Sequence, residues 1–232
     1  MTGDTTNPLI NQLADVALSM HQEHSATATV ESVLGYIKTA VGAQYAGALL
    51  FGSKDAIETV SGSDDIVEQA GAVQVRVGEG PDLTVLDEEQ SILVSDIRAE
   101  PHWPHWAREV ADLGLRSLIS VKLSTRDRAF GSLTVYSIHP DAFTDEDRSI
   151  VEAFARHVAI AVSTSVREHN LNAAIDSRKL IGQAQGILME RFSLSDAQAF
   201  AVLLRYSQNS NTKLRVIAER LVAERTLPPE SE

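Results

Sequence analysis

Apolar positions repeat along the chain with two different periods. Residues 7–22 and 26–41 have apolar positions at helical spacing, and Gly42 ends the second segment. Shorter apolar segments bounded by turn residues have the character of strands. They are residues 46–52, 56–61, 91–95, 115–123 and 129–138. Together these segments predict an α+β domain, with short helices after the turn at 78–81 and over residues 103–113.

A much longer helix is predicted after the last strand. Thr144 precedes the acidic residues 145–147, which is a hydroxyl cap followed by charges that complement the positive end of a helix. A helix from there to Arg191 would be about 70 Å long at about 1.5 Å per residue. This is too long for one small domain, so we expect coiled-coil pairing with the same helix of a second chain. The alternative is a break near residues 167–170, where the apolar spacing falters.

Two short helices complete the predicted pattern. Ser195 and Gln198 form a capping-box sequence ahead of an apolar stretch. Thr212 is expected to cap a last helix. Residues 227–232 contain two prolines, and we expect them to form a disordered tail.

The composition is that of a globular protein. Of 232 residues, 44% are hydrophobic, and the length suits one large domain or a medium domain with a small one. No segment approaches the roughly 18 consecutive apolar residues of a membrane span, and the first residues lack the features of a signal peptide. The absence of cysteine excludes disulfides, thiolate metal sites and cysteine nucleophiles. We therefore expect a cytoplasmic protein without membrane contacts.

The net charge of −12 is unevenly distributed. Residues 1–166 carry 11 Lys and Arg against 24 Asp and Glu, whereas residues 167–225 carry 9 against 6. The acidic body argues against nonspecific nucleic-acid binding by the whole molecule. The C-terminal segment, with its net charge of +3, is the part suited to an anionic partner.

The most specific sequence lies inside this basic segment, over residues 178–189. It reads Arg-Lys-Leu-Ile-Gly-Gln-Ala-Gln-Gly-Ile-Leu-Met. A glycine inside a helix costs about 1 kcal/mol relative to alanine, so Gly182 and Gly186 indicate that something approaches this backbone closely. The alternative is that the two glycines pack against another helix and that the cations only face solvent.

Residues 167–225 resemble the ANTAR family, a small three-helix module that binds RNA and prevents transcription termination. The residues that carry the resemblance are Arg178, Ile181–Met189, Ser195, Gln198–Phe200, Leu204, Arg205, Ser207, Asn211, Lys213, Leu214, Val216 and Ala218. The resemblance implies a dimer that recognises a pair of small RNA hairpins. Gln185 departs from the family, which usually has lysine there, and this removes one cation from the expected contact face.

The resemblance and the helical spacing together define the expected RNA-binding face. Arg178, Gly182 and Gln185 share one stripe of the helix. Unpaired RNA bases are read by hydrogen bonds, by stacking and by phosphate contacts. The candidate RNA-binding residues are Arg178, Lys179, Gly182, Gln183, Gln185, Gly186, Arg191, Arg205, Ser207, Asn211, Lys213 and Arg215. Phe192 and Phe200 are expected in the core, and Tyr206 is the aromatic residue expected to be able to stack.

Residues 25–165 look like a GAF domain, a sensor fold with a central antiparallel sheet and flanking helices. The resemblance rests on the turn Glu79–Pro81, the tryptophan helix, the strand with Phe130–Tyr136 and the helix start Ala142–Asp147. GAF domains that attach bilins or reduce free methionine sulfoxide need cysteines, and the cyclic-nucleotide signature does not match in spacing. No catalytic motif appears elsewhere. We expect no enzyme activity and no cofactor, and the ligand of the sensor stays undefined.

The segment His102–Trp106 holds the candidate ligand-pocket residues of the sensor. Trp103, Trp106 and His102 could line a pocket for a small molecule. His102 and His105 could instead share a metal, although the other histidines of the domain lie on other elements. The interpretation that we favour is a lid helix whose tryptophans pack in the core while its histidines face solvent.

The whole pattern predicts four parts. They are an N-terminal helix (1–24), a GAF sensor domain (25–165), an ANTAR RNA-binding domain (166–226) and a disordered tail (227–232). We expect a bacterial, homodimeric regulator, paired through the long helix, that binds paired hairpins in leader RNA and prevents transcription termination in response to a signal. The alternative is a ligand-binding sensor whose C-terminal helices engage a protein partner or DNA.

Overall fold

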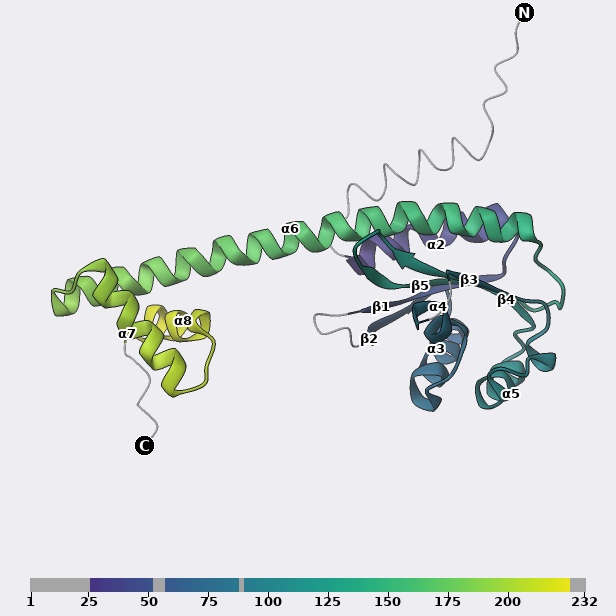
Figure 1. Cartoon of the computed structure of the whole chain (residues 1–232), viewed down its shortest axis with the longest axis horizontal. Helices are drawn as coiled ribbons and strands as arrows, with labels where there is room; N and C mark the ends of the chain where they lie inside the picture. Colours follow the sequence, from purple (N-terminus) through teal and green to yellow (C-terminus); the bar gives the residue numbers. More distant parts are fainter. Residues whose placement is uncertain (1–25, 52–56, 88–89, 226–232) are drawn as a thin grey trace, which may run out of the picture. The chain divides into compact units, whose positions relative to one another are not determined.

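The computed structural model describes residues 26–51, 57–87 and 90–225. The helix expected within residues 1–24 and the tail expected over 227–232 lie outside these residues. The chain divides into two compact units, residues 1–167 (unit 1) and residues 168–232 (unit 2), whose elements are labelled in Figure 1. None of the helices in the described part is long and apolar enough to cross a lipid bilayer.

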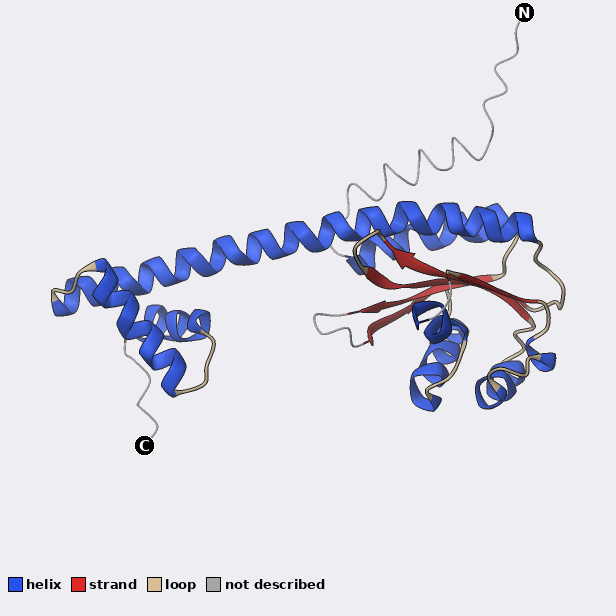
Figure 2. Ribbon diagram, in the orientation of Figure 1, coloured by secondary structure: helices blue, strands red, loops and turns tan. Residues whose placement is uncertain are grey.

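A five-stranded sheet forms the centre of unit 1 (Figure 2). Its strands follow the order β2-β1-β5-β4-β3, and every neighbouring pair is antiparallel. The strands are β1 (Tyr45–Phe51), β2 (Ile57–Gly62), β3 (Ser91–Val94), β4 (Ser117–Ser124) and β5 (Ala129–Ser137). All five strands predicted from the apolar pattern are confirmed, and with them the central antiparallel sheet.

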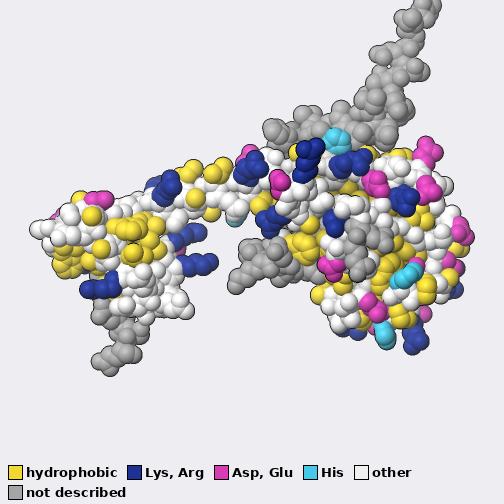
Figure 3. Space-filling view, in the orientation of Figure 1, with side chains coloured by type: hydrophobic (Ala, Val, Ile, Leu, Met, Phe, Trp, Pro, Cys, Tyr) yellow, Lys and Arg dark blue, Asp and Glu magenta, His cyan; other side chains and the backbone are white. Residues whose placement is uncertain are grey.

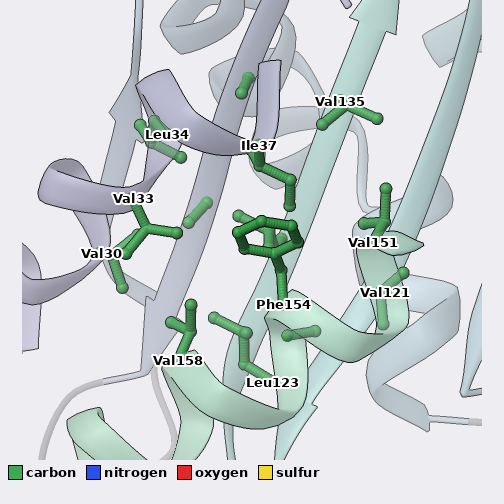
Figure 4. Close-up of a cluster of buried hydrophobic side chains, with 14 of the residues drawn as sticks. Val30, Val33, Leu34, Ile37, Val121, Leu123, Val135, Val151, Phe154 and Val158 are labelled. Atoms are coloured by element: carbon green, nitrogen blue, oxygen red, sulfur yellow. The ribbon is translucent and has the colours of Figure 1, made fainter. Parts of the chain in front are cut away.

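Successive residues of β4 and β5 point to opposite sides of the sheet, and each side has its own core. Helices α2 (Ala26–Val41) and α6 (Asp145–Phe192) cover one side, where Ile37, Val135 and Phe154 are fully buried (Figure 4). The next residue of β5, Tyr136, belongs to the core on the other side. A sheet covered by helices on both sides gives unit 1 two separate apolar layers.

Three helices and one 3-10 turn lie on the second side of the sheet. They are α3 (Asp65–Val77), α4 (Pro81–Asp87), η1 (Ile97–Ala99) and α5 (Pro104–Asp112). Helix α3 is missing from the elements predicted above. Its signal is present, because Val67 and Ala70 are apolar at helical spacing and Gly78 ends the helix with a φ of 74°.

Helix α6 is continuous from Asp145 to Phe192, so the alternative of a break at residues 167–170 is wrong. Its start is capped as predicted. The backbone N–H of Thr144 donates to Asp147 Oδ2 at 2.8 Å, and the N–H of Asp147 donates to Thr144 Oγ1 at 3.3 Å. These reciprocal bonds satisfy donors that a helix start leaves without internal partners.

Unit 2 is a small helical module around one core. It contains the C-terminal part of α6, α7 (Asp196–Asn209) and α8 (Leu214–Glu224). Its fully buried residues are Ala184, Leu188, Ala199, Leu203, Ile217, Ala218 and Leu221. The predicted capping box is present, since Ser195 accepts from the N–H of Gln198 and the Gln198 side chain accepts from the N–H of Ser195.

The expected cap of the last helix is wrong. The N-cap of α8 is Lys213, which makes no side-chain cap bond. Thr212 lies one residue earlier, and its hydroxyl donates to the carbonyl of Ser210 at 3.1 Å. The Thr212 carbonyl accepts a bond of 2.6 Å from Ser207 Oγ. Thr212 therefore stabilises the turn between α7 and α8, and α8 begins without a hydroxyl or carboxylate cap.

Candidate nucleic-acid interface

The two motif glycines lie on an open face of α6. Gly182 and Gly186 are both exposed. A methyl group added to either one would meet no atom of the described chain within 4 Å beyond the local helix. Within one chain, the glycines therefore do not allow helix-on-helix packing, which was the alternative interpretation. Close approach of a partner outside the chain would explain why the helix keeps two residues that destabilise it.

The same motif supplies the packing residues of unit 2 from its other face. Ala184 and Leu188, four residues apart, are buried against α7 and α8 in the core of unit 2. Arg178, Lys179 and Gln183 are exposed. The periodicity of the helix thus separates the apolar residues, which hold the module together, from the glycine, amide and cationic residues, which face outward.

Three of the candidate residues have hydrogen bonds inside unit 2. Gln185 Nε2 donates to Asp196 Oδ1 at 2.8 Å, which ties α6 to the first turn of α7. Arg191 Nη1 donates at 2.6 Å to the carbonyl of Arg225, the residue that ends α8. Ser207 bonds to the turn before α8, as described above. These three residues therefore position the elements of the module, whatever else they contact.

The start of α8 has the features of an anion site. Lys213 is the N-cap, Arg215 is in the first turn, both are exposed, and the first turn has no acidic residue. The backbone N–H groups of Leu214 and Arg215 have no hydrogen-bond partner among the described residues. Cations at the positive end of a helix are unfavourable for the helix itself. The same arrangement of free N–H groups and cations suits a phosphate.

The remaining cations and the turn complete the candidate surface. Arg178, Lys179, Lys213 and Arg215 have no ion-pair partner in the described part of the chain. Arg205 is exposed on α7. Asn211 is exposed in the turn before α8 and has a φ of 47°. Unit 2 thus presents several cations to solvent at two places, the α6 stripe and the start of α8.

Two aromatic residues of unit 2 are not where we expected them. The prediction that Phe192 and Phe200 are core residues is wrong, because 55% and 39% of their surfaces are exposed. The core position of α7 is taken by Ala199, and one residue further along a helix is turned by about 100°. Tyr206 is half-buried and packs against the core of unit 2. The accessible aromatic rings of unit 2 are therefore the phenylalanines.

The tryptophans of α5 pack in the core of unit 1. Trp103 Nε1 donates to Thr84 Oγ1 at 2.9 Å, and Trp106 Nε1 donates to the carbonyl of Ala70 at 3.3 Å. Their rings meet edge to face with centroids 6.0 Å apart. Both belong to the core on the second side of the sheet. These positions match the interpretation of a packed helix, and neither ring lines the two cavities described below.

The neighbouring histidines point to solvent and bond to carboxylates. His102 pairs with Glu100 and His105 with Glu79. No cluster of three or more potential metal ligands exists among the described residues. Glu79 also accepts the backbone N–H groups of Trp106 and His105, at 2.9 and 2.5 Å. The Trp106 bond, assisted by His105, lowers the pKa of the Glu79 carboxyl below its ordinary value.

A buried polar cluster fills the space between the sheet and α3 and α4. The Asp82 carboxylate accepts hydrogen bonds from Gln74, Ser120 and Thr134, and all four side chains are buried. The cavity beside Asp82 is about 10 Å³, which is room for about one water molecule. Burial and the charge of Asp82 raise the pKa of the adjacent Tyr136. The sequence pattern contained no signal for this cluster, because its members come from four elements.

A wider groove lies on the other side of unit 1. It has a volume of about 650 Å³ between the end of β4, the turn after it and helix α6. Lys122, Arg126 and Arg156 line it and have no ion-pair partner among the described residues. Val121 and Ile160 add apolar surface. This groove offers an anionic small molecule both room and positive charge.

Comparison with known protein families separates the two units in the same way as the geometry. The GAF domain family matches residues 23–163, and the ANTAR domain family matches residues 169–222. The chain belongs to the GAF–ANTAR family. Its two parts are therefore a sensor domain and an RNA-binding domain of antitermination regulators. No curated protein matches the GAF–ANTAR chain.

Solved structures similar to this GAF–ANTAR protein include GAF domains and an enzyme. That of a phosphoenolpyruvate-protein phosphotransferase from Coxiella burnetii has a TM-score of 0.56 and 15% identity, and covers 70% of this chain and 96% of its own. The corresponding Acinetobacter domain has a TM-score of 0.54 and 11% identity, covering 72% and 99%. The free methionine-R-sulfoxide reductase from Neisseria meningitidis has a TM-score of 0.53 and 16% identity, covering 72% and 96%. At these identities the likeness establishes the fold of unit 1.

Proposed function

We propose that this GAF–ANTAR protein is a homodimeric regulator that binds paired hairpins in leader RNA and prevents transcription termination. The observation that carries the proposal is the open face of α6. Gly182 and Gly186 are exposed, and no residue in the described ranges contacts them from outside the local helix or forms an ion pair with Arg178 or Lys179 on the same helix. Glycine leaves space for a base or a sugar, and cations bind phosphates. A helix that only supported its own module would have no need of either feature.

The start of α8 supports a second contact with RNA, at its phosphates. Lys213, Arg215 and two free backbone N–H groups are gathered at one helix end. An anion there would accept hydrogen bonds from the backbone and remove the unfavourable interaction of the cations with the helix dipole. Phosphate contacts of this kind fix the position of an RNA without reading its sequence. The α6 face would then supply the sequence-dependent contacts.

The exposed apolar residues of α6 support pairing of two chains through this helix. Ile160, Leu171 and Ile175 have 59%, 58% and 62% of their surfaces exposed on a helix that passes through both units. They are eleven and four residues apart, which places them on one face of the helix, and pairing with a second copy would bury that face. A dimer would present two RNA-binding modules to two hairpins. The second contact would then be intramolecular, which raises affinity beyond the modest charge of one module.

Signal transfer in this proposal uses the helix that the two domains share. Helix α6 lies over the sensor sheet with Phe154 in its core, and it continues into the motif of unit 2. A ligand in the groove beside Arg156 would contact the same helix. Two pairings or registers of α6 in the dimer, favoured differently by the ligand, would be the two states of the switch.

A gel-shift titration with paired hairpins carrying six-base loops tests the proposal. We expect the protein to bind this RNA more tightly than the same stems with changed loop sequences. The variant Arg178→Glu with Lys213→Glu should weaken binding about 100-fold or more, because it reverses two charges at the proposed contacts. Arg98→Glu with Arg108→Glu, the same charge change at two exposed cations of unit 1 outside the groove, is the matched control and should have little effect. Equal affinity for both loop sequences would contradict recognition of the loops.

The alternative is that the C-terminal helices engage a protein partner or DNA. Helix α8 is short and follows α7 closely, as a DNA-recognition helix does. Its cations are Lys213 at the N-cap, Arg215 and Arg220, and it offers few residues able to read base edges in a major groove. Competition with duplex DNA in the same titration distinguishes this case.

A further inference from the structure

Most phenylalanines of unit 1 are buried, whereas those of unit 2 are exposed. In unit 1, Phe130, Phe143 and Phe154 are at least nine-tenths buried, and Phe51 at the end of β1 is half-buried. In unit 2, Phe192 and Phe200 keep 55% and 39% of their surfaces exposed. An aromatic ring left in water gives up a large favourable burial term. Two such rings in one small module therefore indicate a surface that is covered when the protein acts.

Both rings lie on the face that carries the motif. At about 100° per residue, Phe192 falls on the same stripe of α6 as Arg178, Gln185 and Met189. Gln185 bonds to Asp196 in the first turn of α7, and Phe200 is one turn further along α7. The bond therefore joins the stripe of α6 to the part of α7 that presents Phe200.

The surface around these rings is partly apolar and partly polar. Met189 and Leu204 are also exposed, at 36% and 39%. Figure 3 shows hydrophobic side chains gathered on unit 2, over the end of α6 and the neighbouring helices, with Lys and Arg side chains around them. Flat apolar surface bordered by cations and amides is the combination that binds unpaired nucleotides, because bases stack while phosphates meet the cations.

We propose that Phe192 and Phe200 form the stacking surface for unpaired bases of an RNA hairpin loop. The inference rests on the proposed function and adds which residues meet the bases. Charge favours RNA as the occupant of this surface. Residues 167–225 carry a net charge of +3 on a chain whose total is −12, and Arg178 on the shared stripe has no ion-pair partner among the described residues. A base on the rings would place its phosphates within reach of these cations.

The salt dependence of RNA binding distinguishes the loss of a stacking contact from the loss of a phosphate contact. We expect Phe192→Ala and Phe200→Ala each to weaken hairpin binding about 10- to 100-fold, the effect typical of losing one stacked base. The slope of log K against log salt should stay unchanged, since no phosphate contact is lost. Arg178→Ala should instead reduce that slope by about 0.7 to 0.9. Phe192→Ala should leave the denaturant midpoint of unit 2 nearly unchanged, because more than half of its surface is exposed, whereas Phe200→Ala should lower the midpoint somewhat, because most of its surface is buried.

Aromatic and aliphatic replacements give the decisive comparison. Phe200→Trp should retain binding, because it keeps a flat π surface, whereas Phe200→Leu should weaken it nearly as much as Phe200→Ala. A hairpin with 2-aminopurine in the loop should show fluorescence quenching with the wild-type protein and lose it with Phe200→Leu.

Four outcomes would overturn the inference. Binding retained by Phe200→Leu, or dissociation of the dimer into monomers in native mass spectrometry of Phe192→Ala, would assign the surface to an aliphatic or protein contact. Tight loop-specific binding by the wild type and equal binding by both alanine variants would overturn the stacking role alone. Absence of hairpin binding by the wild type would overturn the proposed function and the inference with it.

Discussion

The sensor unit and the RNA-binding unit place similar types of residue in opposite environments. Unit 1 buries both tryptophans and three of its four phenylalanines, and it surrounds the buried carboxylate of Asp82 with donors. Unit 2 leaves two phenylalanines exposed and puts Lys213 and Arg215 at the wrong end of a helix for stability. It also keeps two glycines in a helix where no described residue beyond the local helix comes near them. Features that raise the energy of the isolated module are concentrated where a partner is expected.

This difference indicates how to separate residues that fold the molecule from residues that bind. In unit 1, a substitution should mainly change stability. In unit 2, removing an unfavourable feature of the surface should raise stability and lower RNA affinity together. Opposite changes in the two quantities are a stronger sign of a binding residue than lost affinity alone, because a misfolded module also loses affinity.

The largest expected effect is the loss of a core ring in the sensor. Phe154 is fully buried between α6 and the sheet (Figure 4). Phe154→Ala should destabilise unit 1 by about 3–5 kcal/mol, from lost burial and the cavity that remains. Urea unfolding followed by tryptophan fluorescence measures this, because both tryptophans are in unit 1. A similar loss in the unfolding of unit 2, followed by circular dichroism at the same urea concentrations, would contradict the independence of the two cores.

A smaller loss is expected at the buried carboxylate. Asp82→Ala leaves Gln74, Ser120 and Thr134 without their common acceptor. The cost should be about 2–4 kcal/mol, because buried donors lose their acceptor, while the bond of 2.8 Å from Thr134 Oγ1 to Ser120 Oγ remains. Asp96, which is partly exposed and pairs with Arg116, is a suitable control, and Asp96→Ala should cost about 1 kcal/mol or less. Equal effects of the two substitutions in urea unfolding would show that the buried network is not specially stabilising.

The sheet and the long helix were predictable because their signals are local. Short apolar segments bounded by turn residues marked the five strands, and a capped start followed by no proline, and by no glycine before Gly182, marked α6. The hydrogen bonds of Asp82 were not predictable, since they depend on the packing of α3, α4, β4 and β5. Helix α3 had a local signal in Val67 and Ala70 that was overlooked.

In the candidate site, too, the features set by local periodicity could be predicted and those set by tertiary packing could not. The open face of Gly182 and Gly186 follows from helical periodicity around the buried Ala184 and Leu188. The exposure of Phe200 could not be predicted in this way. Where a phenylalanine and an alanine are neighbours in sequence, the larger apolar residue is expected to be the buried one. Only the packing of α7 decides that Ala199 faces the core. Residue type alone therefore predicts the wrong environment for Phe200, one of the two rings proposed to stack on RNA bases.

Replacing a motif glycine should have a moderate effect, raising the stability of unit 2 and lowering its RNA affinity. Gly186→Ala meets no atom within 4 Å in the described chain beyond the local helix. It should therefore stabilise unit 2 by about 1 kcal/mol through helix propensity alone. RNA affinity should fall about tenfold, because the added methyl group stands where a base or sugar approaches. Urea unfolding and gel shift measure the two changes.

The reverse substitution away from the proposed contacts is the matched control. Ala223 is exposed near the C-terminal end of α8, about 15 Å along the helix from Lys213. Ala223→Gly should destabilise unit 2 by up to about 1 kcal/mol and leave RNA affinity unchanged. If Gly186→Ala gained stability without any loss of affinity, the open face of α6 would not be the RNA contact.

The smallest expected change in stability comes from the charge at the start of α8. Arg215→Glu puts an acid in the first turn and should stabilise the helix by about 0.3–1 kcal/mol, since negative charge complements its positive end. RNA affinity should fall, because the glutamate would repel the phosphate bound there. Arg220→Glu makes the same change in net charge in the second half of α8 and should lower stability slightly. If the two variants lost affinity equally, the cause would be the total charge of the module, and the start of α8 would not be a phosphate site.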